Sequence, residues 1–194
     1  MAPFCGRCLV AGSIRRRKEE VKDIEIVATP IMETAYVQEG LFSEEVTVNL
    51  LHRWATTQLI ISWIKPGVSQ IVPWKIKPEG KYWRGLLPSG IKLDLFIADY
   101  TNFGLIYAIR TGCADFSSAL LAHANTRSRY QTETRWYEDR PELKKRGESG
   151  YLVAKANGER VATPEERDVF ELLGLEYIEP HERVAWDSLR VRRL

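Results

Sequence analysis

Two neighbouring stretches of sequence decide the expected fold: residues 12–17, which read GSIRRR, and residues 23–25, which read DIE. The apolar residues 9–11 predict a short buried strand that ends at Gly12, where the missing Cβ permits a close approach between backbone and ligand. We expect Ser13 to cap or open a helix whose free N–H groups face an anion.

A second strand is predicted to follow at residues 23–27, and it carries two acids. Because side chains alternate along a strand, Asp23 and Glu25 project from the same face. Two like charges side by side are unfavourable unless a cation neutralises them, and hard divalent ions prefer such oxygen pairs. The two stretches together favour a metal ion that holds a nucleoside triphosphate.

A third acid, Asp94, stands in the middle of the apolar run IKLDLFI at residues 91–97, which predicts another strand. Burying an unpaired carboxylate is costly. If this strand lies beside the one that carries Asp23 and Glu25, the three acids form a cage for metal ions. Two ions about 3.5–4 Å apart would then activate a 3′-hydroxyl and hold the leaving pyrophosphate.

The order of these motifs resembles family X DNA polymerases, the polymerase beta group of the nucleotidyltransferase superfamily. The Gly-Ser and Arg-Arg motif, the Asp-x-Glu pair and the lone strand Asp are followed by a Thr-Gly pair at residues 111–112. Residues 115–117, 163–170 and 173–175 resemble the family's later helices, and residues 177–183 its Tyr-x-x-Pro-x-x-Arg ending. The resemblance runs from about Leu9 to Arg183.

The resemblance implies a DNA-directed DNA polymerase that adds nucleotides from dNTPs to a primer 3′-hydroxyl by two-metal catalysis. It implies that the metals are two Mg²⁺ ions, with Mn²⁺ as an alternative, bound by Asp23, Glu25 and Asp94, and that Lys92 orients Asp94 or touches the primer phosphate. The implied nucleotide-binding residues are Gly12, Ser13, Arg16, Ile109, Arg110, Thr111, Gly112, Phe116 and Ser117.

Three positions depart from the family pattern. Glu25 stands where the family's second acid is Asp, and residues 109–110 replace an aromatic pair that precedes Thr-Gly. Leu121 stands where an Arg that reads the template-side minor groove is expected. These departures leave sugar discrimination and fidelity open. Since the helix-hairpin-helix and lyase modules have no counterpart before Leu9, we expect a minimal, distributive, gap-filling or repair-like enzyme.

Composition agrees with a globular protein that meets nucleic acid. The chain has 194 residues, of which 44% are hydrophobic, and its net charge is +2. Its positive charge is concentrated in residues 15–22, 127–146 and 190–193. Such basic clusters can follow a phosphate backbone. The nucleic-acid candidates are Arg127, Arg129, Arg135, Lys144, Lys145 and Arg183, and the expected partner is primer-template DNA.

The rest of the composition favours a soluble, cytoplasmic monomer. No 18-residue apolar span is present, so we expect no membrane helix. Three cysteines, an odd number, suit a reducing compartment. The pair Cys5 and Cys8 has the spacing of a zinc or redox motif, but no matching second pair exists, so we expect Cys5 to end one segment and Cys8 to begin the first strand.

The expected fold is α+β. A nucleotidyltransferase palm at residues 1–100 has a mixed sheet flanked by helices, and a C-terminal lobe at residues 101–194 is smaller and also α+β. Within the palm we expect a helix at residues 44–61 and a strand at 82–86; the lobe should hold helices at 103–110 and 115–127 and strands at 131–137 and 151–154. The residues 163–166, TPEE, predict a helix start with Thr163 as its cap.

Two other functions compete with templated synthesis. A non-templated or small-substrate nucleotidyltransferase would use the same metal site, since function is set by the site and not by the fold. A non-catalytic nucleic-acid-binding protein would have no need for all three acids.

Overall fold

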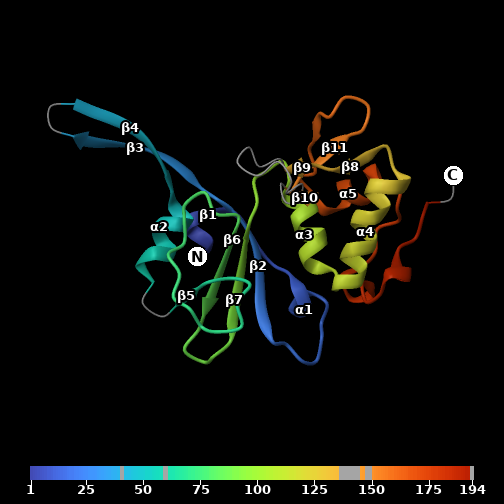
Figure 1. Cartoon of the computed structure of the whole chain (residues 1–194), viewed down its shortest axis with the longest axis horizontal. Coiled ribbons are helices and arrows are strands. Elements are labelled where there is room, and N and C mark those ends of the chain that lie inside the picture. Colours follow the sequence, from blue (N-terminus) through green and yellow to red (C-terminus); the bar gives the residue numbers. More distant parts are fainter. Residues whose placement is uncertain (40–41, 59–60, 136–144, 147–149, 193–194) are drawn as a thin grey trace.

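The computed structural model describes residues 1–39, 42–58, 61–135, 145–146 and 150–192 (Figure 1). Its longer helices are α2 (Leu50–Thr57), α3 (Phe103–Thr111), α4 (Ala114–Arg127) and α5 (Glu166–Leu172); α1 (Gly12–Arg15) is a single turn, and short 3₁₀ helices cover Ala2–Phe4, Pro180–Glu182 and Trp186–Ser188. The strands are β1 (Cys5–Val10), β2 (Asp23–Pro30), β3 (Met32–Glu39), β4 (Phe42–Asn49), β5 (Ser62–Ile64), β6 (Tyr82–Leu86), β7 (Lys92–Ile97), β8 (Tyr130–Thr132), β9 (Thr134–Arg135), β10 (Lys145–Arg146), β11 (Leu152–Ala154) and β12 (Arg160–Val161).

A five-stranded mixed sheet in the order β1-β2-β7-β6-β5 organises the N-terminal half. Strands β2 and β7 are parallel neighbours, and the other adjacent pairs are antiparallel. The predicted α+β class with a mixed sheet is therefore confirmed. The predicted adjacency of the strands that carry Glu25 and Asp94 is also what the structure has.

Helices cover the two faces of this sheet, and successive side chains of β7 point alternately toward one face and the other. Leu95 packs on one face with Leu51 and Ala55 of α2. Phe96 packs on the opposite face with Phe103 and Tyr107 of α3. Asp94 therefore lies on the α3 face, because residues two apart in a strand share a face.

A long hairpin of β3 and β4 follows β2 and extends away from the sheet (Figure 1). The predicted helix at residues 44–61 is therefore wrong in its first part: Phe42–Asn49 form β4, and the helix begins at Leu50. Val46, Thr47 and Val48 are β-branched, which favours a strand. The side chain of Asn49 then caps α2 by accepting a hydrogen bond from the His52 N–H at 2.9 Å.

The C-terminal half has its own core, in which α3, α4 and α5 bury side chains such as Leu105, Leu120 and Phe170. A small sheet of β12, β11 and β8 lies beside these helices (Figure 1). Helices α3 and α4, and the strands β6, β7 and β11, lie close to their predicted positions. The division at residues 100 and 101 stays a prediction.

The start of α5 differs from the prediction. Glu165, and not Thr163, is the N-cap, and its N–H donates to Asp168 Oδ2 at 2.7 Å. Thr163 is buried against the segment that leads into α3. Its N–H donates to the Thr101 carbonyl, and its carbonyl accepts from the Gly104 N–H. Among the described residues, no helix has the length and apolar character needed to cross a membrane.

Candidate nucleotidyltransferase site

Three strands bring acidic and basic side chains together on the α3 face of the sheet. Glu25 on β2 and Asp94 on β7 are paired residues of the parallel register, and Asp23 is paired with Lys92 two residues before them. Asp94 is in turn paired with Arg84 on the antiparallel neighbour β6. Paired positions on adjacent strands share a face, so these side chains form one row across the sheet.

Asp94 is almost completely buried, with 4% of its surface exposed, and its carboxylate accepts hydrogen bonds from two neighbours. Arg84 donates from Nε to Oδ1 at 2.6 Å and from Nη2 to Oδ2 at 2.7 Å. The Tyr82 hydroxyl also donates to Oδ1, at 2.8 Å. Burial and this hydrogen bond raise the pKa of Tyr82 well above its ordinary value. The cost of burying Asp94 is therefore offset by an arginine and a tyrosine.

The side chains in this arrangement do not fit the predicted metal cage. Within the described part of the chain, no three Asp, Glu, His or Cys side chains lie close enough together to hold a metal ion. Both carboxylate oxygens of Asp94 accept hydrogen bonds from Arg84, on the side of β7 that faces β6 and not β2. The resemblance predicted that Asp23, Glu25 and Asp94 converge. In the structure Glu25 and Asp94 are neighbours, and Arg84 lies on the other side of Asp94.

Glu25 fills the space that the absent side chain of Gly12 leaves. Gly12 has a φ of +61°, and a Cβ there would overlap the Glu25 carboxylate. The close approach expected between Gly12 and a ligand is thus made by Glu25. Burial, and then the negative charges of Asp23 and Asp94, raise the pKa of Glu25. Ser13 lies inside the single turn α1 instead of capping it, since Ala11 is the N-cap.

A basic cleft of about 670 Å³ opens beside this row of acids. Its lining residues are Ser13, Arg16, Arg17, Lys18, Glu19, Glu20, Lys22 and Asp23. Two polar atoms here, Ser13 Oγ and Arg16 Nε, are buried without a hydrogen-bond partner among the described residues. Since buried polar atoms are nearly always hydrogen-bonded, these two mark a place that suits an anionic ligand. Lys92 is exposed nearby on β7.

The predicted sugar pocket at the end of α3 is only partly available. Thr111 has no exposed surface, because its hydroxyl accepts from Arg15 Nη1 and its carbonyl accepts from Arg16 Nη1, both at 2.6 Å. Ile109 and Gly112 are half-buried. Arg110 places its guanidinium over the Phe96 ring, 4.0 Å from the ring centroid. Thr111 thus positions the two arginines and cannot itself contact a nucleotide.

Three predicted ligand-binding residues belong to the core, and those predictions are wrong. Phe116 is fully buried among apolar side chains of α3, α4 and α5. Ser117 is buried, and its hydroxyl donates to the Ile109 carbonyl at 2.6 Å. Arg183, predicted to bind nucleic acid, is also fully buried, so no phosphate can reach its guanidinium.

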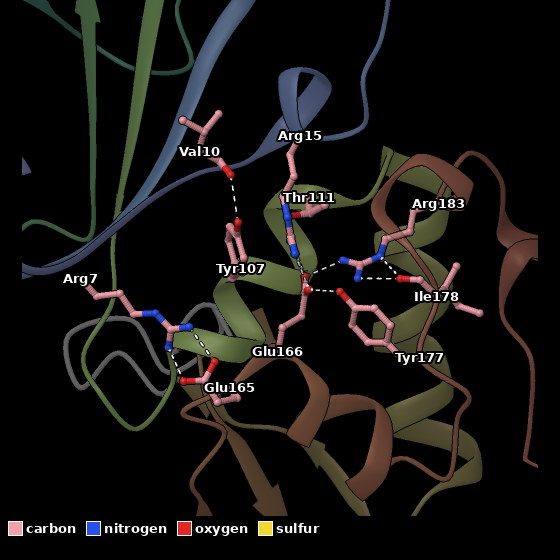
Figure 2. Close-up of polar contacts among 10 residues, drawn as sticks. All are labelled: Arg7, Val10, Arg15, Tyr107, Thr111, Glu165, Glu166, Tyr177, Ile178 and Arg183. Carbon is pink, nitrogen blue, oxygen red and sulfur yellow. Dashed lines mark hydrogen bonds and ion pairs between the residues drawn. The ribbon is translucent and has the colours of Figure 1, made fainter.

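The partner of Arg183 is Glu166, the centre of a polar cluster between the two halves of the chain (Figure 2). Glu166 accepts two hydrogen bonds from Arg15 at 2.7 Å each, one from Arg183 at 2.6 Å and one from the Tyr177 hydroxyl at 2.9 Å. Burial alone would raise the pKa of Glu166, but the hydrogen bonds from Arg15 and Arg183 lower it to about 2. A second pair, Arg7 with Glu165, lies beside the cluster (Figure 2).

The other residues predicted to bind nucleic acid lie at the end of α4 and on the short strands β9 and β10. Arg127 and Arg129 are exposed and help to line a cleft of about 1070 Å³ at the C-terminal end of α4. Arg135 lies on β9 and Lys145 on its partner β10. Lys144 lies outside the described residues.

Sequence reasoning missed the basic partners of both buried acids. A lone acid within an apolar strand requires a positively charged partner. Tyr82 and Arg84, which share a face of the preceding strand β6, are the signal that could have identified the partner of Asp94. Glu166 carried a weaker signal, because it is one of the two acids within the predicted helix start at residues 163–166.

Two comparisons with known proteins relate the chain to DNA polymerases. Residues 107–184 match the family model described as DNA polymerase beta thumb. The chain is also 27% identical to DNA polymerase lambda of Rattus norvegicus over 184 residues, which cover 91% of this chain and 28% of that relative. The chain is thus similar to family X DNA polymerases, and the resemblance predicted from its sequence motifs is confirmed.

This family X polymerase-like chain spans just over a quarter of the length of the relative it matches. The matched thumb region begins within α3 and includes α4, α5, Glu166 and Arg183. The five-stranded sheet and the basic cleft are built mainly from residues that precede this region.

Proposed function

We propose that this chain carries the nucleotidyltransferase unit of a DNA-directed DNA polymerase, which adds nucleoside monophosphates from dNTPs to a primer 3′-hydroxyl. The observation that carries the proposal is the parallel register of β2 and β7, which pairs Glu25 with Asp94 beside a basic cleft. The similarity to DNA polymerase lambda and the thumb-family match support the same reaction class.

Each part of the site has a role in this proposal. Ser13 and Arg16 bind the triphosphate, because Ser13 Oγ and Arg16 Nε are the buried polar atoms that lack partners in the cleft. Arg110 lies over the Phe96 ring and Lys92 is paired with Asp23 in the register of β2 and β7, and we assign these two residues to the sugar and the primer phosphate. Glu25 and Asp94 are assigned to the reacting centre, because the parallel register of β2 and β7 pairs them. Arg127 and Arg129 contact the DNA backbone.

The prediction of Mg²⁺ or Mn²⁺ stays a prediction, because the present side-chain arrangement has Asp94 bound to Arg84 and Tyr82. Gap filling, distributive synthesis and the monomeric state likewise stay predictions. Non-templated addition is the alternative that shares every residue named above.

Primer extension separates these possibilities. The chain is incubated with a labelled primer, alone or annealed to a template across a short gap, with dNTPs or NTPs, and with Mg²⁺, Mn²⁺ or a chelator. Templated addition of the complementary dNTP supports the proposal. Addition that ignores the template favours the alternative, and no addition under any combination contradicts both.

A further inference from the structure

Strand β1 contains an irregularity that changes which of its residues share a face. Cys5 pairs with Pro30, whereas Arg7 pairs with Thr29 and Cys8 with Ala28, so the register shifts at Gly6. Such a β-bulge places two residues of one strand opposite one residue of its neighbour. A side chain at Gly6 would collide with the Tyr100 hydroxyl, so the bulge is built around a glycine.

The bulge brings Cys5 and Cys8 to the same face of the sheet. Residues three apart in a regular strand point to opposite faces. Here the partners of the two cysteines, Pro30 and Ala28, are two residues apart and share a face. The two cysteine Cα atoms should therefore be separated by roughly two strand residues, about 7 Å. Disulfides span Cα separations of up to about 6.8 Å, so a small backbone adjustment joins the pair.

The surroundings of the two thiols make them unequal. Both side chains are half-buried, and neither is in a disulfide. The Cys5 sulfur lies 3.6 Å from the Met1 carbonyl oxygen and packs against the core under α2. The side-chain hydrogen bond with Cys5 lowers the pKa of Cys8 to about 7, while the same interaction and burial raise the pKa of Cys5. Cys8 therefore has the larger thiolate fraction and is the thiol that reacts first. Cys5 is the neighbouring thiol that can attack a disulfide formed on Cys8.

We propose that Cys5 and Cys8 are a redox pair, in which Cys8 reacts with a low-molecular-weight disulfide and Cys5 resolves the adduct into an intramolecular disulfide across the bulge. A metal site is a poorer account of the pair, because among the described residues no third Asp, Glu, His or Cys side chain completes a ligand group. The proposal is independent of nucleotide transfer.

The reaction balances with glutathione disulfide as the oxidant. The Cys8 thiolate attacks one of its sulfur atoms, the glutathione S–S bond breaks, and one glutathione thiolate leaves. The Cys5 thiol gives its proton to solvent and attacks the Cys8 sulfur of the mixed disulfide, which expels the second glutathione. Cys5 and Cys8 lose two electrons and two protons, and one glutathione disulfide becomes two thiols.

The bulge also gives the pair a connection to the rest of the molecule. Arg7 stands between the two cysteines on the opposite face, where its guanidinium lies 4.0 Å from the Phe103 ring centroid and pairs with Glu165 at 2.6 Å. Glu165 is the N-cap of α5. A disulfide across the bulge therefore constrains the backbone that carries Arg7.

Intact mass and thiol counting test the proposal on the whole chain. The reduced protein is incubated with glutathione disulfide near pH 7, quenched with acid, and its free thiols are counted after denaturation. We expect the protein to lose two hydrogen atoms without retaining glutathione, and the free thiols to fall from three to one. Peptide mapping should place the bridge between Cys5 and Cys8.

Three variants make the result decisive. Cys5→Ser should stop at a stable glutathione adduct on Cys8, whereas Cys8→Ser should form neither bridge nor adduct at a comparable rate. The matched control Cys113→Ser should still form the bridge, because Cys113 is a half-buried cysteine at the start of α4. A bridge that includes Cys113, or equal glutathione adducts on all three cysteines without loss of hydrogen, would overturn the proposal.

Discussion

Arg84 holds Asp94 by two parallel hydrogen bonds, from Nε to Oδ1 at 2.6 Å and from Nη2 to Oδ2 at 2.7 Å. The pair joins β6 to β7 in the row that also contains Glu25. Removing one partner of a buried ion pair leaves an uncompensated charge. Arg84 is thus a structural counterion of the acid on which the proposed chemistry depends.

Replacing Arg84 by methionine should therefore destabilise the fold, by about 3 kcal/mol if the cost resembles that of other broken buried pairs. The double variant Arg84→Met/Asp94→Leu should recover most of this loss, because neither side chain is then a buried charge. Urea unfolding measures both. An unfolding midpoint for Arg84→Met equal to that of the wild type would show that the pair contributes nothing to stability.

Glu166 makes stability depend on pH. Its folded-state pKa of about 2 lies below the ordinary value of 4.5, so its contribution is present above pH 4.5 and is lost as the pH falls toward 2. The shift corresponds to about 3 kcal/mol. Glu166→Gln should lower the unfolding free energy at pH 7 by this order and flatten the acid limb of the stability curve.

The exposed Glu176→Gln is the control for Glu166, because Glu176 has no resolved ion pair in the described structure and lies outside the cluster. Unfolding free energies are measured at several pH values between 3 and 7. Parallel stability curves for Glu166→Gln and the wild type would contradict the assigned role of the cluster.

Arg16 should be required for binding the triphosphate. Charge-assisted hydrogen bonds contribute about 1.5–3 kcal/mol, so Arg16→Ala should weaken dNTP binding by about tenfold or more. Anisotropy of a fluorescent dNTP measures the affinity. Arg53→Ala, an exposed arginine on α2 outside the cleft, is the matched control and should bind as the wild type does. Equal affinities for the two variants would remove the cleft from the proposal.

Arg127 and Arg129 should contact the DNA backbone. The double variant Arg127→Ala/Arg129→Ala should weaken binding to DNA of any sequence and reduce the slope of log affinity against log salt by about 2. The slope comes from titrations at several salt concentrations, with Arg53→Ala as the control for lost positive charge. A slope unchanged from the wild type would place the DNA elsewhere on the surface.

Local sequence patterns were enough to predict the strands and helices that have a clear run of apolar residues or a strong motif. The apolar run at residues 91–97 predicted β7, and the adjacency of β2 and β7 was correctly inferred from the need to bring the acids together. The helix expected from residue 44 failed because spacing alone does not separate alternating valines from a helical face; the capping Asn49 marks the true boundary.

The site was harder to predict because burial and partners are properties of the tertiary fold. Arg183 and Phe116 lie in motifs that resemble a nucleotide-binding family, yet both are fully buried. Likewise, the hydroxyl and the carbonyl of Thr111 accept hydrogen bonds from Arg15 and Arg16. Strand β1 begins at Cys5 and not at Cys8 as expected, and the bulge at Gly6, which places both cysteines on one face, has no signal in the local sequence.

Templated nucleotide incorporation by Asp94→Asn tests the central claim most directly, because this variant keeps the size of the side chain and removes its charge. The control is Asp115→Asn, an exposed acid on α4, and circular dichroism verifies that both variants fold. The account predicts that Asp94→Asn loses at least about 100-fold in incorporation rate while Asp115→Asn retains the wild-type rate. A folded Asp94→Asn protein that extends primers as fast as Asp115→Asn would contradict it.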